Sequence, residues 1–132
     1  MQKLQPEISL KRAYDTPDES DGTRVLVDRL WPRGVRKADL KIAMWLKNVA
    51  PSTDLRKWFA HDPTKWVVFQ ERYLDELQHG DNDLCTLLNL AHSGKITLVY
   101  AAHDEIHNHA LVLREFLRRT LAQSKNKQSS NL

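Results

Sequence analysis

The sequence predicts a single α/β domain of three layers, with a small, mostly parallel sheet flanked by helices. Three short apolar segments alternate along the chain with longer segments whose apolar residues recur at helical spacing. Strands separated by helices pair in parallel, so helices cover the sheet. The length of 132 residues suits one domain. We place it at residues 1–122 and expect a polar, disordered tail at residues 123–132.

The first two predicted strands lie in the N-terminal part of the chain. Residues 7–12 alternate in polarity, which is typical of a strand. A turn-rich segment follows at residues 15–22. Residues 24–28 then contain a contiguous Val-Leu-Val, which suits a strand buried on both faces.

The middle of the chain predicts helices. Residues 39–50 have an ambiguous pattern, from which we expect a short helix near residues 40–45. Ser52 is a typical N-cap for the next short helix. Residues 62–63, Asp-Pro, combine a cap with a first-turn proline and begin a longer helix that ends at Gly80.

The C-terminal part predicts two more helices and the third strand. Apolar residues recur at helical spacing from Leu84 to Ala91, and Gly94 ends that helix. Residues 95–100 form the third strand, and the apolar spacing over residues 113–121 indicates a long last helix.

Three loops are expected at one edge of this sheet. The carboxyl ends of parallel strands face the same way, and ligands of such sheets bind beyond those ends. The loops begin at Arg12, Asp28 and Ala101. We therefore expect the functional site at this edge.

The densest polar cluster is the Asp-Arg-Leu-Trp-Pro-Arg-Gly run at residues 28–34. Arg29 and Arg33 carry planar forks of donors that match phosphate or carboxylate. Trp31 is a candidate for stacking on a ring. Asp28 is placed to orient a guanidinium or to act as a base. The structural alternative is a salt bridge from Asp28 to an arginine, which would only hold the loop in place.

A second cluster follows the third strand and opens the last helix. A helix N-terminus attracts anions and favours a neutral imidazole. A neutral histidine there can act as a general base. The candidates are His107 and His109, with Asp104 as a carboxylate partner. The alternative is that Asp104 or Asn108 simply caps the helix.

The same cluster permits a metal hypothesis. His103 and His107 are four residues apart, a spacing that would place two imidazoles on one helix face, with Asp104 between them. This spacing supports a metal-dependent hydrolase as an alternative function, although we assign no residue as a metal ligand.

Arg56 completes the basic set. It lies in the first turn of the helix after Ser52, where the helix dipole disfavours a cation. A bound anion or the neighbouring Asp54 would compensate. We assign Trp58 and Phe59 to the core.

The net charge of +3 is unevenly distributed. From Arg114 to the end there are five basic residues and one acid, so the rest of the chain is close to neutral. A basic last helix and tail support a second hypothesis, a nucleic-acid-binding or regulatory module. The structural alternative is a solvated helix end, because cations favour helix C-termini.

Several other classes of protein are disfavoured. No apolar run is long enough to span a bilayer, and a single cysteine, Cys85, fits the reducing cytoplasm. Cys85 lies on an apolar helical pattern without basic neighbours, so we expect a small core residue. The sequence has no phosphate-binding glycine loop, nucleophile elbow or paired cysteines.

The clusters also resemble a known family. The Lys-Arg-Ala-Tyr-Asp run at residues 11–15, the long run at residues 21–34 that ends in Trp-Pro-Arg-Gly, and the Leu-Arg-Lys-Trp-Phe run at residues 55–59 are similar to the YeaO-like proteins. So are Tyr100-Ala101-Ala102 and the His-Asn-His-Ala run at residues 107–110.

These are small bacterial members of a domain-of-unknown-function family, and the resemblance implies a bacterial cytoplasmic α/β protein without supplying a reaction. Related branches carry a cysteine near the position of Tyr100 and a Cys-His-Arg run near residues 107–109. This chain lacks both, which disfavours thiol chemistry.

The first hypothesis is therefore a binder of a small anionic, nucleotide-like ligand, with or without turnover. We predict that arginine neutralises the ligand, that Trp31 or Tyr100 packs on its ring, and that histidine and carboxylate handle protons. The sequence leaves the cofactor, the reaction and the oligomeric state open. The predicted catalytic residues are Asp28, Asp104, His107 and His109, and the predicted ligand-binding residues are Arg12, Arg29, Trp31, Arg33, Arg56, Tyr100 and Asn108.

Overall fold

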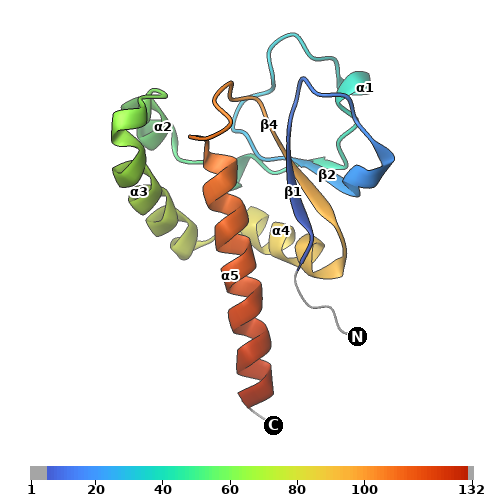
Figure 1. Ribbon diagram of the computed structural model, residues 1–132, viewed down its shortest axis with the longest axis vertical. Coiled ribbons are helices and arrows are strands. Elements are labelled where there is room, and N and C mark those ends of the chain that lie inside the picture. Colours follow the sequence, from blue (N-terminus) through green and yellow to red (C-terminus); the bar gives the residue numbers. More distant parts are fainter. Residues whose placement is uncertain (1–5, 131–132) are drawn as a thin grey trace.

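Four parallel strands form the sheet of the protein, in the order β1-β4-β2-β3 (Figure 1). The computed structural model describes residues 6–130, with side chains to residue 123. The predicted α/β class with a parallel sheet is confirmed. The strands are β1 (Ile8–Arg12), β2 (Thr23–Leu26), β3 (Met44–Trp45) and β4 (Ile96–Tyr100).

The last strand of the chain occupies the centre of the sheet. β4 pairs with β1 on one side, with Leu98 opposite Leu10, and with β2 on the other, with Leu98 opposite Val25. All five residues of β4 are buried. The carboxyl ends of β1, β2 and β4 consequently meet at one edge, as the parallel pattern predicts.

The predicted helix boundaries are largely confirmed. The Ser52 hydroxyl accepts a hydrogen bond from the Leu55 amide at 3.1 Å, so Ser52 caps α2 as expected. Pro63 begins a 3₁₀ turn that leads into α3, and Gly80 and Gly94 follow the ends of α3 and α4. The helices are α1 (Lys37–Leu40), α2 (Thr53–Phe59), α3 (Trp66–His79), α4 (Asn82–Ser93) and α5 (His109–Ser130).

The two faces of the sheet are covered differently. On one face, Val25 and Leu98 pack against α2, α3, α4 and α5 in the main core. On the other face, Leu26 and Val99 form a smaller cluster with Leu40 of α1 and residues of the loop between β2 and β3. The third layer is therefore thin, because a four-residue helix and a loop supply it.

The prediction of a short helix near residues 40–45 is wrong in part. α1 ends at Leu40, and Lys41 adopts a left-handed conformation with φ of 52°. The chain then runs beside β2, where the Ala43 amide donates to the Arg24 carbonyl at 2.7 Å and Met44 and Trp45 form β3. Two residues are too few to show the alternation that identifies a strand.

A buried ion network supports the crossover from β1 to β2. This connection contains only a 3₁₀ helix, η1 (Glu19–Asp21). Asp21 accepts from Lys11 Nζ at 3.0 Å and from Arg24 Nη1 at 2.7 Å. Arg24 also donates to the Leu40 carbonyl at 2.7 Å. The network therefore fixes the crossover to both β1 and α1.

Cys85 lies on the outer face of α4 and is exposed. The prediction of a core position is wrong, because Leu84 and Leu87 point inward and Cys85, the residue after Leu84, is turned about 100° away from it around the helix axis. No helix within the described residues is long and apolar enough to cross a membrane.

The tail boundary at residue 123 stays a prediction. The α5 backbone continues as helix to Ser130, and residues 131–132 lie outside the described residues. In Figure 1, α5 extends beyond the rest of the fold at its C-terminal end.

Candidate functional site

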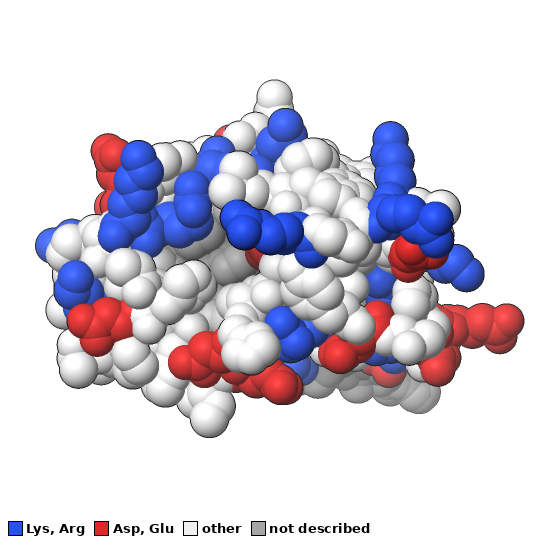
Figure 2. Space-filling view, turned by 90° about the horizontal axis from the view of Figure 1, so that it is seen from above, with Lys and Arg blue, Asp and Glu red and all other residues white. Residues whose placement is uncertain are grey.

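A cavity of about 540 Å³ opens at the carboxyl edge of the sheet. The loops after β1, β2 and β4 contribute to it, together with α2 and α3. Figure 2 looks onto this side of the molecule and shows a hollow with Lys and Arg side chains around it. The lining includes nine predicted site residues: Asp28, Arg29, Trp31, Arg33, Arg56, Asp104, His107, Asn108 and His109.

Asp28 connects the ends of β2 and β4. Its Oδ2 accepts from the Ala101 amide at 2.9 Å. Its Oδ1 is buried without a well-formed hydrogen bond and lies 3.3 Å from His109 Nε2. The salt bridge to an arginine that the sequence offered as an alternative is not formed within the described residues.

His109, the first residue of α5, is tied to β2. Its Nε2 lies 3.0 Å from the Val27 carbonyl oxygen and 3.3 Å from Asp28 Oδ1. Both neighbours are acceptors, so Nε2 carries a proton. This nitrogen is therefore a donor that fixes α5 to the sheet, and it is not a base.

Asp104 and His107 form a carboxylate–imidazole pair. Asp104 Oδ1 accepts from the amides of Ile106 and His107 at 2.9 Å each, and Oδ2 lies 2.9 Å from His107 Nδ1. These hydrogen bonds lower the pKa of Asp104 to about 2. The ionised carboxylate accepts a hydrogen bond, so Nδ1 of His107 carries a proton. In the neutral ring, Nε2 is then the nitrogen without a proton.

The metal geometry proposed from the spacing of His103 and His107 does not form. Residues 101–108 are a loop, and the helix begins only at His109. The Nδ1 of His103 lies 3.4 Å from Arg12 Nη2 and faces a donor. No group of three or more His, Cys, Asp or Glu residues is arranged to hold a metal ion in the described part of the chain.

The three cavity arginines lack carboxylate partners. Arg29 donates to the carbonyls of Pro51 and Ala50, both at 3.2 Å. Arg56 has a buried Nε without a hydrogen-bond partner, and Arg33 is exposed at the rim. Among the described side chains, no Asp or Glu oxygen lies within 4.0 Å of these guanidiniums. The sequence allowed Asp54 to compensate the charge of Arg56, but these two described side chains form no ion pair.

Two predicted ligand-binding residues, Arg12 and Tyr100, lie outside the cavity lining, and a third, Asn108, lines it and also caps a helix. Arg12 does not line the cavity, and its Nε donates to the Ala102 carbonyl at 2.9 Å. Tyr100 is 4% exposed and belongs to the main core, where burial raises its pKa. Asn108 caps α5, since its Oδ1 accepts from Leu111 N at 3.1 Å.

The aromatic residues take distinct places. Trp31 lines the cavity and donates from Nε1 to the Val35 carbonyl at 2.7 Å. Phe59 is a core residue as expected and also reaches the cavity, stacked on Phe69 with ring centroids 4.3 Å apart. Trp58, which was assigned to the core, is only partly buried and packs against it, with the cationic groups of Lys65 and Arg72 near its ring.

Sequence reasoning missed Tyr14, His61 and Phe69 as cavity residues. His61 reaches the cavity because Ala60 and His61 both adopt left-handed backbone conformations, with φ of 47° and 57°. Such conformations are uncommon outside glycine and asparagine. Neither alanine nor histidine indicates a left-handed turn at residues 60–61. The predicted helix start at residues 62–63 indicated only that the chain changes direction close to this point.

The basic C-terminal helix provides little support for the nucleic-acid hypothesis. Arg119 pairs with Glu115 at 3.1 Å, and Arg114 is half-buried, with a pKa lowered by that burial. The side chains of Lys125 and Lys127 lie outside the described residues.

The comparison with known proteins identifies the family. A model described as the inactive DUF488-N3 subclade matches residues 7–132. The "Uncharacterized protein YeaO" of Escherichia coli K12 is 45% identical over 111 residues, which cover 84% of this chain and 96% of that protein. The "Uncharacterized protein Rv3073c" of Mycobacterium tuberculosis H37Rv is 41% identical over 110 residues, which cover 83% and 92%. No solved structure matches. The resemblance seen in the sequence is confirmed, and the chain belongs to the YeaO-like branch of the DUF488 family, in its inactive N3 subclade.

Proposed function

We propose that this protein binds a small anion that carries an apolar or ring-shaped part, such as a nucleotide, in the cavity at the carboxyl edge. The observation that carries the proposal is the set of three arginines without carboxylate partners among the described residues, one of which, Arg56, has a buried and unpartnered Nε. An unpaired buried donor costs free energy that a bound acceptor would recover.

Arg29 is held ready for such a ligand. Its guanidinium donates to two backbone carbonyls, which fix its orientation without neutralising its charge. The conformational entropy of this long side chain is thus lost on folding and not on binding, which favours affinity.

The rest of the lining favours a ligand larger than a bare inorganic ion. The cavity volume of about 540 Å³ is in the range of small-molecule sites. Apolar groups line much of it, including Leu30, Trp31, Pro51, Phe59 and Phe69. A ligand with one charged end and one apolar end would complement both kinds of surface.

Binding is favoured over turnover. The subclade is described as inactive, and this chain has no cysteine at Tyr100 or in the His-Asn-His run, the positions where the resemblance implies cysteines in related branches. His109 also presents a protonated nitrogen to Val27 and Asp28 instead of a free base. A cytoplasmic location stays a prediction that rests on the lone cysteine.

The first experiment is a thermal-shift screen of nucleotides, sugar phosphates and carboxylates. A ligand at about 100 times its dissociation constant stabilises a protein by about 2.7 kcal/mol, which such a screen detects. The Arg56→Gln variant should lower the affinity for a hit by roughly tenfold or more, the scale of a hydrogen bond to a charged group.

The matched control is Arg36→Gln. Arg36 is exposed, pairs with Asp39 outside the cavity, and should leave affinity unchanged. Equal losses in the two variants would contradict the site. A salt-sensitive response to oligonucleotides alone would instead support the nucleic-acid module.

A further inference from the structure

His107 differs from the other histidines of the cavity in what its two ring nitrogens face. Nδ1 lies 2.9 Å from Asp104 Oδ2, so this nitrogen faces a hydrogen-bond acceptor. Nε2 has no hydrogen-bond partner among the described residues, and His107 lines the cavity. Nδ1 of His103, by contrast, lies 3.4 Å from Arg12 Nη2, which is a hydrogen-bond donor.

A series of packed aromatic rings connects His107 with α2, the helix that carries Arg56. The Trp66 ring packs edge-on to His107 at 5.4 Å and stacks on Phe69 at 5.7 Å. Phe69 stacks on Phe59, which lies one turn after Arg56 on α2. His107 therefore contacts one end of a chain of packed aromatic rings, and Arg56 lies one turn before the ring at its other end, Phe59.

The charges around the cavity determine how much negative charge it can compensate. Arg29, Arg33 and Arg56 contribute three positive charges, and Asp28 and Asp104 contribute two negative ones. With neutral imidazoles at His61, His103, His107 and His109, the lining carries one net positive charge. This charge balances that of a bound monoanion. The charge of a bound dianion is balanced only if the lining takes up one more proton.

We infer that the ligand is a phosphate monoester of an aromatic or other apolar group, and that its dianion binds together with one proton held on His107 Nε2. This inference rests on the proposed function of the cavity. A phosphate monoester offers three terminal oxygens to donors from several loops and is a dianion above pH 6 or so. The protonated His107 would donate one hydrogen bond to it, while Asp104 stabilises the imidazolium from the other side.

Isothermal titration calorimetry with two matched probes tests this directly. Phenyl phosphate and benzenesulfonate share the ring and the tetrahedral anion but differ by one charge at pH 8. Each probe is titrated in two buffers of different ionisation enthalpy. Phenyl phosphate should bind with uptake of about one proton, because the folded site gains a proton on binding. Benzenesulfonate should bind with almost none.

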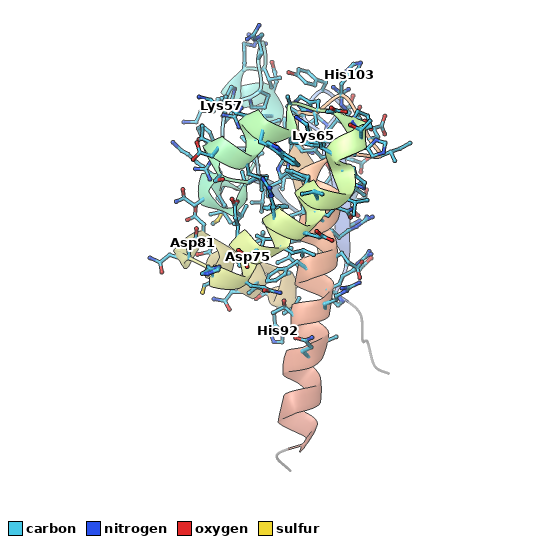
Figure 3. All side chains as sticks on the ribbon, turned by 90° about the vertical axis from the view of Figure 1, so that its left-hand side faces the viewer. Lys57, Lys65, Asp75, Asp81, His92 and His103 are labelled. Atoms are coloured by element: carbon cyan, nitrogen blue, oxygen red, sulfur yellow. The ribbon has the colours of Figure 1, made fainter. Side chains whose placement is uncertain are left out.

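The variant His107→Gln removes the titrating ring and keeps a hydrogen-bonding side chain. It should abolish the proton uptake and weaken phenyl phosphate roughly tenfold or more, the scale of a charge-assisted hydrogen bond. The benzenesulfonate affinity should change little. His92→Gln is the control, since His92 is exposed on α4, far from His103 and the cavity (Figure 3).

Asp104→Asn tests the positioning residue separately. Asparagine can still accept the amide hydrogen bonds of Ile106 and His107 through Oδ1, but it cannot stabilise an imidazolium as a carboxylate does. Proton uptake should fall, while the melting temperature without ligand confirms that the variant is folded.

The outcomes separate the two proposals. Phenyl phosphate that binds without proton uptake, or with the same uptake in His107→Gln, overturns the role of His107 but leaves anion binding intact. In the second case another titratable group of the cavity lining would take up the proton. Equal affinity for phenyl phosphate and benzenesulfonate overturns the monoester class. Failure of every anion to bind the unaltered protein overturns the proposed function itself.

Discussion

Arg24 and Asp21 are charged side chains in the interior, 5% and 6% exposed. Burial alone would raise the pKa of Asp21, but hydrogen bonds from Lys11, the Asp18 backbone and Arg24 lower it below its ordinary value. Arg24 also binds the Leu40 carbonyl through two nitrogens. One guanidinium thus satisfies a carboxylate and a helix terminus together.

Arg24→Met keeps the apolar volume of the side chain but removes these bonds. It should lower the free energy of unfolding by about 3 kcal/mol, because a buried carboxylate loses its partner. Urea unfolding at pH 7 measures the change. Arg36→Met breaks an exposed pair and should cost less than about 1 kcal/mol. Equal losses would mean that the buried network contributes no more than a surface salt bridge.

Single residues also show where sequence reasoning ends. The position of Asp28 and Arg29 at the site follows from the carboxyl-edge rule, and the structure places both at the cavity. The contacts of these side chains could not be predicted by this rule. Arg29 donates to the backbone carbonyls of Ala50 and Pro51. Because every residue carries a backbone carbonyl, the sequence does not indicate which ones an arginine will contact. Tyr100 is buried because β4 is central, a pairing that periodicity cannot reveal.

At the level of elements, glycine determines how β2 begins. Gly22 has φ of 66°, and a Cβ atom there would lie 2.5 Å from the Lys95 carbonyl oxygen. The close approach lets the Thr23 amide donate to that oxygen at 3.1 Å, which starts the pairing of β2 with β4. A side chain at this position must push the two strands apart.

Gly22→Ala should therefore destabilise the fold by about 3 kcal/mol, through backbone strain and the clash together. Gly80→Ala is the matched control, with φ of 65° and open space around the position of its Cβ. It should cost only the strain of an alanine at φ of 65° and ψ of 166°, about 2 kcal/mol. Thermal or urea unfolding of both variants separates the two contributions, and a similar loss in each would exclude the clash.

The elements that the sequence predicted well are those with local signals. Ser52 and residues 62–63 mark helix starts through caps that act on the next few amides. The loop that begins at Ala101 was predicted, whereas β3 was not identified. β3 depends on pairing with β2, and the loop depends on the Asx turn of Asp104, which takes the hydrogen bonds that a helix would otherwise use.

For the whole molecule, the predicted boundary at residue 122 can be tested by truncation. Leu113, Leu117 and Leu121 of α5 pack against the main core, and Ala122 and Gln123 are exposed. A chain that ends at residue 123 should keep its melting temperature within about 2 °C, since surface changes rarely exceed 0.5 kcal/mol. Differential scanning calorimetry checks this, and a large loss would place residues after 123 within the domain.

The central position of β4 has a consequence for how the chain assembles. β1 and β2 are not neighbours in the sheet, and each pairs with β4, which begins at residue 96. During synthesis on the ribosome, about three quarters of the chain must therefore emerge before the sheet can close. Until then β1 has no partner strand and β2 has only the two-residue β3. Folding is therefore delayed by sequence-distant contacts, and the nascent chain depends on its local helices to limit exposed apolar surface.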